Sequence, residues 1–209
     1  MNNPWLNIPA SDYEGHMGLP EVDQLKFLGN VFKESLNKYD SRSLAYLGCA
    51  TGNGLEYIDN KKTEQLTVID INPEYLEILK TRYQKQIPEM EIIETDLRSY
   101  EGKGRRYSLI FAGLLFEYVS PESLLLKIAK WIENKGVLVV VLQLEDRNIK
   151  KVSATPYTSL KMLEPVMNLV SERDFRLMAQ ESGMAETEGK IVTLKSGKSF
   201  YIGAYQKAE

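Results

Sequence analysis

The sequence has very little of the two side chains that most often bind zinc. Its 209 residues include a single cysteine, Cys49, and a single histidine, His16. One thiol cannot form an internal disulfide, and a zinc site needs a cluster of cysteine and histidine ligands. We therefore expect no metal site and a protein suited to a reducing interior.

The chain also lacks a long apolar run and a marked excess of charge. No apolar stretch approaches the roughly 20 residues that cross a bilayer, and residues 1–10 lack the basic start and apolar centre of a secretion signal. The 26 basic and 29 acidic side chains leave a net charge of -3, which gives no overall attraction for a polyanion. We expect a soluble, cytoplasmic protein with no membrane or nucleic-acid partner. The oligomeric state stays open.

What the sequence does contain is an alternation of short apolar runs with amphipathic stretches. Runs of uniformly apolar residues are typical of parallel strands that helices cover on both faces. Five such runs lie at 44–47, 66–69, 90–93, 107–111 and 137–142. Two more, at 191–194 and 200–205, flank a short turn with glycine and predict an antiparallel hairpin. We therefore predict an α/β fold with a doubly wound, mostly parallel seven-stranded sheet.

Helix starts are marked by capping residues. Asn72 and Ser120 each precede a proline, a combination that favours the first turn of a helix, and Ser171 opens a capping box. Apolar spacing predicts an N-terminal helix from Pro20, and Leu55 is expected to begin another.

The chain has no repeat and no linker, and its length and 43% hydrophobic content suit a single domain over 1–209. Within it we expect four segments. These are a cap segment with a helix (1–40), a ligand-binding core (43–143), a substrate lid (144–170) and a C-terminal helix with the hairpin (171–209). A long loop is the competing interpretation of 144–170.

The loop after the first predicted strand is rich in glycine. Gly48, Gly52 and Gly54 allow the backbone to turn tightly and to approach a ligand. In a doubly wound sheet, ligands bind beyond the carboxyl ends of the strands, and the first of these loops is the usual anchor. A plain tight turn would need the same glycines, so the loop alone leaves both interpretations open.

Two acidic residues strengthen the ligand-binding interpretation. Asp70 ends the second strand about 20 residues after the glycines, where a carboxylate can accept both hydroxyls of a ribose. Asp96 follows the third strand and can meet an adenine amino group. A helix cap and a solvated loop acid are the respective alternatives.

The order of these features resembles the class I S-adenosylmethionine-dependent methyltransferases from about Ser43 to the C-terminus. Residues 47–54, 68–74, 95–97, 107–119 and 131–141 are similar to five successive motifs of that family. The resemblance implies S-adenosylmethionine as cofactor, with the glycine loop on its methionine part, Asp70 on the ribose and Asp96 with Leu97 on the adenine. The implied cofactor-binding residues are Gly48, Cys49, Ala50, Gly52, Asp70, Ile71, Asp96, Leu97, Ala112 and Gly113.

Two residues depart from the family pattern. Tyr46 stands where the family usually has an acid for the methionine ammonium, and Ala50 replaces the middle glycine. The backbone accommodates Ala50 if its φ is negative. Glu117 is a substitute for the missing acid, and Cys49 is expected to be a small filler without a redox role.

Methyl transfer needs alignment of the acceptor and, for an acceptor that carries a proton, a base. Residues 12–17 resemble a segment that folds over the cofactor in small-molecule methyltransferases, so His16 and Tyr13 are candidates for acceptor contact or general base. Glu117 and Tyr118 follow the fourth strand, at a position that often faces the acceptor. A surface-loop histidine and a solvent-facing helix start are the competing interpretations.

We therefore expect a methyltransferase of a small-molecule acceptor whose identity the sequence does not give. A nicotinamide-dependent oxidoreductase would use the same sheet and acid, but the loop lacks a clean Gly-x-Gly-x-x-Gly and the terminal hairpin disfavours it. A non-catalytic cofactor-binding module is the third hypothesis, because of Tyr46 and Ala50.

Overall fold

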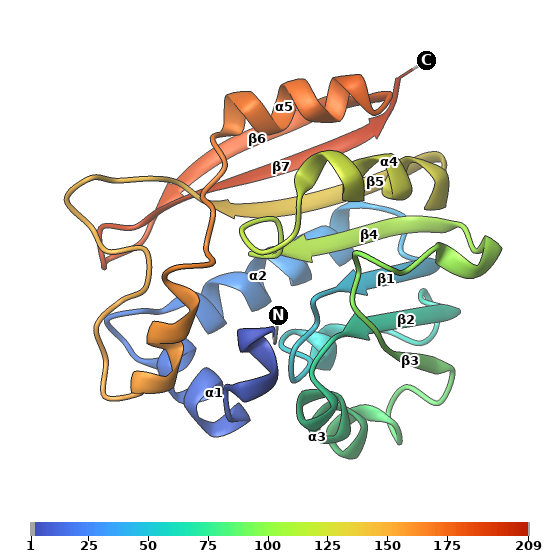
Figure 1. Ribbon diagram of the computed structural model, residues 1–209. Coiled ribbons are helices and arrows are strands. Elements are labelled where there is room, and N and C mark those ends of the chain that lie inside the picture. Colours follow the sequence, from blue (N-terminus) through green and yellow to red (C-terminus); the bar gives the residue numbers. More distant parts are fainter. Residues whose placement is uncertain (1–2, 209) are drawn as a thin grey trace.

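The computed structural model describes residues 3–208 and contains a seven-stranded sheet with the strand order β3-β2-β1-β4-β5-β7-β6 (Figure 1). Met1, Asn2 and Glu209, at the ends of the predicted domain, lie outside the described residues. Strands β1 to β5 pair in parallel, whereas β7 is antiparallel to both β5 and β6. The predicted α/β class and the mostly parallel sheet with an antiparallel end are confirmed.

The strands are β1 (Ser43–Leu47), β2 (Gln65–Asp70), β3 (Met90–Glu94), β4 (Tyr107–Gly113), β5 (Ile132–Gln143), β6 (Met184–Thr193) and β7 (Ser199–Lys207). The α-helices are α1 (Ala10–Gly18), α2 (Gln24–Lys38), α3 (Pro73–Tyr83), α4 (Pro121–Trp131) and α5 (Glu172–Glu181). Short 3-10 helices are η1 (Pro4–Asn7), η2 (Leu55–Tyr57), η3 (Gly102–Gly104) and η4 (Thr158–Leu163).

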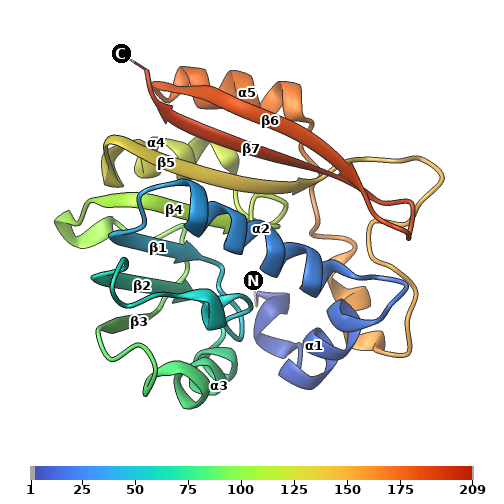
Figure 2. The same ribbon diagram turned by 180° about the vertical axis from the view of Figure 1, so that it is seen from behind.

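Alternate side chains of the strands enter two different hydrophobic clusters. In one cluster, Phe32 of α2 stacks on Tyr46 of β1 with ring centroids 4.9 Å apart, and α3 joins the same cluster. In the other, Phe175 of α5 packs on Tyr205 of β7 at 5.4 Å, and α4 contributes as well. Figures 1 and 2, which view opposite sides, show α4 and α5 in front of the sheet in one view and α2 in the other.

Each predicted cap is present. The Asn72 side chain accepts hydrogen bonds from the N–H groups of Glu74 and Tyr75, Ser120 accepts one from Ser123, and Ser171 accepts one from Asp174. These bonds occupy N–H groups that have no partner within the helix. Local sequence therefore determines where α3, α4 and α5 begin.

Other boundaries differ from the prediction. The helix expected from Leu55 is the single turn η2, because Asp59 O accepts the N–H groups of Lys62 and Thr63 and turns the chain into β2. The helix predicted from Pro20 is α2, which begins only at Gln24 because a turn closed by hydrogen bonds to Leu19 O precedes it.

The carboxyl ends of the parallel strands face one side of the molecule. In Figure 1 the arrowheads of β1, β2, β4 and β5 point toward α1 and toward the segment that carries η4. The N-terminal residues and residues 144–170, far apart in sequence, therefore meet at the strand ends. Within residues 3–208, no helix combines the length and the apolar character needed to cross a membrane.

Candidate functional site

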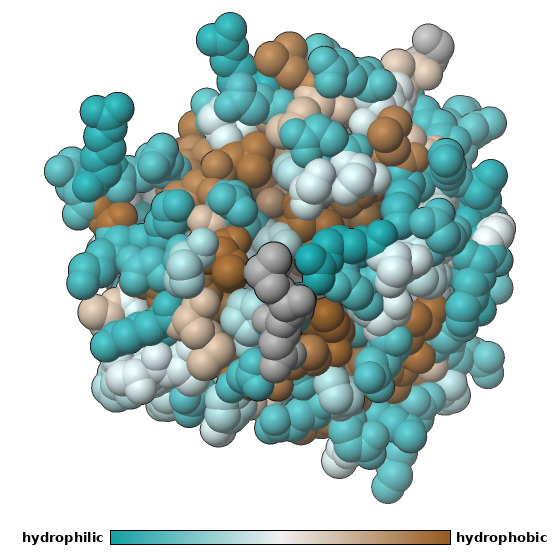
Figure 3. All heavy atoms as spheres, in the orientation of Figure 1, coloured by the Kyte–Doolittle hydropathy of each residue, from teal (hydrophilic) through white to brown (hydrophobic). Residues whose placement is uncertain are grey.

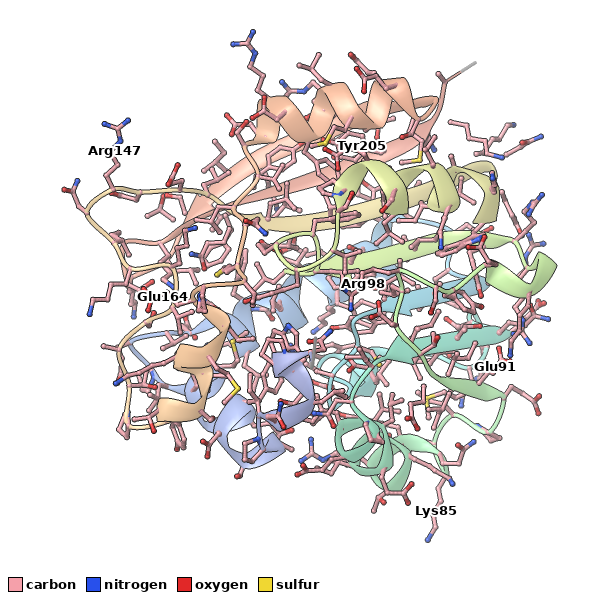
Figure 4. All side chains as sticks on the ribbon, viewed as in Figure 1. Lys85, Glu91, Arg98, Arg147, Glu164 and Tyr205 are labelled. Atoms are coloured by element: carbon pink, nitrogen blue, oxygen red, sulfur yellow. The ribbon has the colours of Figure 1, made fainter. Side chains whose placement is uncertain are left out.

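A single cavity lies at the carboxyl ends of the parallel strands. On the face of the molecule seen in Figure 3, apolar side chains show around the centre between hydrophilic ones. Arg98, which follows β3, lies near the middle of Figure 4, whereas Glu164 and Arg147 belong to segment 144–170. The predicted site residues that line the cavity are Tyr13, His16, Gly48, Ala50, Asp70, Ile71, Asp96, Leu97 and Gly113.

The glycine loop turns back on itself directly after β1. The N–H groups of Gly48 and Cys49 both donate to Ile69 O, at 2.8 and 3.2 Å, and the N–H of Gly52 closes a turn on Cys49 O at 2.9 Å. A Cβ on Gly52 would lie 2.9 Å from the Tyr83 ring, and φ there is +88°. This position thus requires glycine both for its conformation and for its packing.

Ala50 does not meet the condition of a negative φ. Its φ is +46°, in the left-handed region that costs an L-residue about 1–2 kcal/mol. The strained conformation is held by a hydrogen bond from the Ala50 N–H to Asp70 Oδ2 at 2.8 Å. This loop and β2 together determine the Ala50 conformation, whereas the sequence reveals only the residue type.

Asp70 lies at the end of β2 and reaches the cavity with both carboxylate oxygens anchored. Oδ2 accepts the Ala50 N–H, and Oδ1 accepts the Asn72 N–H at 2.9 Å. Burial raises the pKa of Asp70, and these backbone donors oppose the rise. A carboxylate has about four lone-pair sites, so the two bonds leave acceptor capacity for ligand hydroxyls.

Asp96 is already engaged by a neighbour. Arg98 Nε lies 3.0 Å from Oδ1 and 2.9 Å from Oδ2, and the Arg98 backbone N–H also donates to Oδ1. The Arg98 guanidinium holds the pKa of Asp96 below its usual range. A ligand amino group at Asp96 would share this carboxylate with Arg98, a residue that the sequence interpretation missed.

Three of the predicted cofactor-binding residues do not line the cavity. Cys49, Gly52 and Ala112 are not among its lining residues, and Cys49 and Ala112 are almost fully buried. Burial raises the pKa of the Cys49 thiol well above its usual value, as expected of a small filler. These residues shape the backbone behind the cavity wall.

Tyr46 is part of the hydrophobic core and does not line the cavity. Its ring lies between Phe32 and Phe111, with centroids 4.9 and 5.1 Å away, and its hydroxyl donates to Asn53 O at 3.2 Å. A carboxylate in this apolar setting would pay a large desolvation cost. The departure at Tyr46 is therefore consistent with the packing around it.

The N-terminal helix α1 covers the glycine loop. Glu14 accepts a hydrogen bond from Thr51 Oγ1 at 2.5 Å and forms a bidentate ion pair with Arg82 of α3. On the same helix, Tyr13 packs on Tyr75, with ring centroids 5.4 Å apart. Burial raises the pKa of Tyr13 far above 10, so its hydroxyl stays protonated and can donate a hydrogen bond but does not act as a base at neutral pH.

His16 is also on α1 and is 5% exposed, so the surface-loop interpretation is wrong. Its Nδ1 lies 2.9 Å from Thr155 Oγ1, in the segment that was predicted to be a lid. Burial and then the charge of Lys198 lower the pKa of His16. The ring is therefore neutral at pH 7 and can accept a proton.

Glu117 is buried and is not among the residues that line the cavity. Its Oε1 accepts the Gln143 N–H at 2.7 Å, whereas Oε2 has no hydrogen-bond partner within residues 3–208. The solvent-facing interpretation is thus wrong, and Glu117 does not border this cavity. Tyr118, the next residue, does line the cavity.

The buried carboxyl group of Glu117 should make the stability of the protein depend on pH. Burial raises its pKa from 4.5 to about 7, so between pH 4.5 and 7 the folded protein binds more protons than the unfolded chain. The free energy of unfolding then falls as pH rises through this window. Glu117→Gln removes this titration, and its stability relative to wild type should rise by about 3 kcal/mol between pH 4.5 and 8.

Urea unfolding of both proteins at the two pH values measures this difference. Glu64→Gln, a change at an exposed position, serves as the control. A difference between Glu117→Gln and wild type that stays constant with pH would contradict the assignment.

Several residues that line the cavity were not identified from the sequence. Trp5 of η1 packs edge-to-face on Tyr118 at 5.0 Å, and Lys198 enters the cavity from the β6–β7 turn. No motif marks either residue, because an apolar residue near a terminus and a lysine in a hairpin turn are ordinary features. Their placement depends on how 3–18 and 144–170 fold across the strand ends.

Comparison with known proteins supports the resemblance. Residues 45–136 match a family model described as a methyltransferase domain. A search of curated protein sequences gave no match. The match covers β1 to the start of β5, the part of the chain that holds the glycine loop, Asp70 and Asp96.

Solved structures share the fold at low sequence identity. The N-methyltransferase NodS from Bradyrhizobium japonicum, in complex with S-adenosylhomocysteine, has a TM-score of 0.68 and 16% identity over 89% of this chain and 88% of its own. The magnesium protoporphyrin IX methyltransferase ChlM from Synechocystis, with bound S-adenosylhomocysteine, has a TM-score of 0.65 and 12% identity over 89% and 84%. The cyclase SpnF has a TM-score of 0.68 and 11% identity over 87% and 81%. The predicted resemblance to class I methyltransferases is confirmed, and the presence of a cyclase indicates that the fold alone does not determine the reaction.

Proposed function

We propose that this chain, which has the fold and the motif order of the class I methyltransferases, is an S-adenosylmethionine-dependent methyltransferase of a small-molecule acceptor. The observation that carries the proposal is the convergence of Gly48, Asp70, Asp96 and Gly113 on one cavity. These residues come from the ends of four adjacent strands or the loops after them. A cofactor that spans the strand ends would contact all four.

The residues present fit an adenosyl ligand. Asp70 retains acceptor capacity beyond its two backbone hydrogen bonds, as binding of a ribose diol requires. Glycine at position 48, with φ of +65°, keeps the loop backbone next to the cavity free of a side chain. Asp96 would meet the adenine amino group while keeping its ion pair with Arg98.

When bound, the cofactor supplies an electrophilic methyl group on a positively charged sulfur. The chain then has to hold an acceptor atom in line with that methyl and to exclude water. Trp5, Tyr13 and Tyr118 provide an apolar cover, and neutral His16 can receive a proton from an acceptor that carries one. In this proposal His16 is the base and Tyr13 a hydrogen-bond donor.

The packing of segment 144–170 supports its proposed role as a substrate lid. Leu160 and Leu163 of η4 are buried against Ile8, so 3–18 and 144–170 together form the cover over the strand ends. The cavity that they enclose suits a small molecule. We propose that the acceptor enters between these two segments.

The proposal is tested by incubation of the protein with S-adenosylmethionine and a panel of small acceptors, with detection of S-adenosylhomocysteine. Formation of S-adenosylhomocysteine that depends on one acceptor would support the proposal. A fluorescence titration with NADH addresses the oxidoreductase hypothesis. Tight binding of NADH together with no binding of S-adenosylhomocysteine would overturn the methyltransferase assignment.

A further inference from the structure

The far end of the cavity contains a buried lysine. Lys198 is in the turn between β6 and β7 and is 4% exposed, although lysine is almost never buried without a charged partner. Strand β7 is separated from β2 by β5, β4 and β1, so Lys198 lies at the opposite end of the cavity from Asp70. Lys195, in the same turn, is exposed and shows that the turn itself does not require burial of a lysine.

The ammonium group of Lys198 has only neutral partners. Nζ donates to Lys151 O at 2.6 Å and to Gln143 Oε1 at 3.4 Å. No ion pair within residues 3–208 includes Lys198. An ammonium has three N–H donors, so one donor is left for a further acceptor.

The groups around Lys198 do not offset its charge. Lys151, whose Nζ donates to Met167 O, and His16 line the same cavity, and neither side chain supplies a negative charge. Glu117 is a buried acid that does not line the cavity, and its Oε1 accepts the Gln143 N–H. At the other end, Asp70 and Asp96 are held by backbone N–H groups and by Arg98, respectively.

Burial without a counter-ion affects Lys198 directly. It lowers the pKa of Lys198 from its usual value near 10.5 to about 8. The side chain is therefore still mostly protonated at pH 7, at the cost of losing its hydration. A ligand that supplies the opposite charge compensates a buried charge of this kind.

The walls beside Lys198 are apolar. Leu160, Leu163, Met167 and Val152 from segment 144–170 line the cavity, and Trp5 and Tyr118 pack against the cluster that contains Leu160 and Leu163. Such walls fit an aliphatic or aromatic body. One ammonium matches the single charge of a carboxylate, whereas a phosphate dianion is usually met by several cationic or N–H donors.

We propose that the acceptor is a small apolar or aromatic molecule with a carboxylate group that forms an ion pair with Lys198. This inference rests on the proposed methyltransferase function and adds the chemical class of the acceptor. The carboxylate anchors the molecule at Lys198 and leaves the other end of the acceptor to reach the methyl group. Lys198 is thus a specificity-determining residue.

The test compares cinnamate and phenylacetate with their neutral amides, cinnamamide and phenylacetamide. Binding is measured by calorimetry at pH 7, with and without saturating S-adenosylhomocysteine. The acids should bind wild-type protein at least about tenfold more tightly than the amides. Equal affinity for acids and amides, or no binding of either acid, would overturn the proposal, and this comparison does not depend on the folding of any variant.

Variants then test whether Lys198 causes the preference for acids over amides. Lys198→Met should abolish the preference for acids and leave the amides unchanged, Lys198→Arg should retain it, and Lys195→Met, at the exposed position, should have no effect. An acid preference that persists in Lys198→Met would contradict the assignment of Lys198. The affinity for S-adenosylhomocysteine is measured in the same samples. If the wild-type protein does not bind S-adenosylhomocysteine, the proposed function fails. If it binds S-adenosylhomocysteine but does not prefer the acids, only the assignment of the acceptor class fails.

Discussion

Replacement of Asp70 with alanine should weaken binding of S-adenosylhomocysteine by at least about tenfold, or about 1.4 kcal/mol. The carboxylate is the group placed to accept the ribose hydroxyls, and hydrogen bonds to a charged acceptor are stronger than those between neutral groups. The change also leaves the N–H groups of Ala50 and Asn72 without their acceptor, so the glycine loop loses its tie to β2. Isothermal titration calorimetry measures the change in affinity.

Asp70→Asn separates the two effects. Asparagine keeps the shape and one acceptor oxygen but loses the charge, so its affinity should fall between those of wild type and Asp70→Ala. Asp59→Ala, in an exposed turn before β2, is the matched control and should bind normally. Wild-type affinity in Asp70→Ala would remove the ribose assignment.

The second large effect is expected at Gly52. Gly52→Ala should destabilise the protein by about 3 kcal/mol, because a left-handed alanine costs about 1–2 kcal/mol and overpacking adds about 1–3 kcal/mol. The added Cβ would lie 2.9 Å from Tyr83 Cε2 and 3.0 Å from both Leu55 Cδ1 and Leu79 Cγ. Urea unfolding monitored by circular dichroism gives the free energy of unfolding.

Gly104 provides the control for conformation alone. Its φ is +74°, close to that of Gly52, but a Cβ there would have no heavy atom within 4 Å among the described residues. Gly104→Ala should therefore cost only the backbone strain, about 1–2 kcal/mol. If the two variants lost equal stability, close packing of the loop against α3 would not be the reason for glycine at position 52.

The parts of the fold that the sequence predicted are those with a local cause. Asn72 and Ser120 cap their helices through hydrogen bonds to N–H groups two or three residues away, and the apolar runs that form β1 and β4 are buried along their length. The position of Asp70 at the end of β2 was predictable for the same local reason, because Asp70 directly follows an apolar run. Such features need no knowledge of the rest of the chain.

The parts that the sequence did not predict depend on distant contacts. Helix α1 has Gly15 in its centre and weak apolar periodicity, and Glu14 ties it to Arg82, 68 residues away. Strand β6 starts at Met184, earlier than its apolar run at Ile191, because pairing with β7 extends it through polar residues at the sheet edge. Charged residues on an exposed edge strand do not resemble a buried strand in sequence.

The same division applies to the site. The end of the cavity where we propose that the cofactor binds is built on strand termini, and the sequence indicated many of its lining residues. It did not indicate the φ of Ala50 or the pairing of Asp96 with Arg98. The other end, where we propose that the acceptor binds, is built where 3–18, 144–170 and the β6–β7 turn meet, so the burial of His16 and Lys198 could be seen only in the folded chain. The lining of this end of the cavity therefore depends on the tertiary structure.

In the proposed function, the cavity at the strand ends holds the adenosyl cofactor. Isothermal titration of the wild-type protein with S-adenosylhomocysteine tests it most directly. We predict saturable binding of one molecule per chain, with a dissociation constant in the micromolar range, about 8 kcal/mol of binding free energy. No binding at millimolar ligand by a protein that circular dichroism reports as folded would contradict the account.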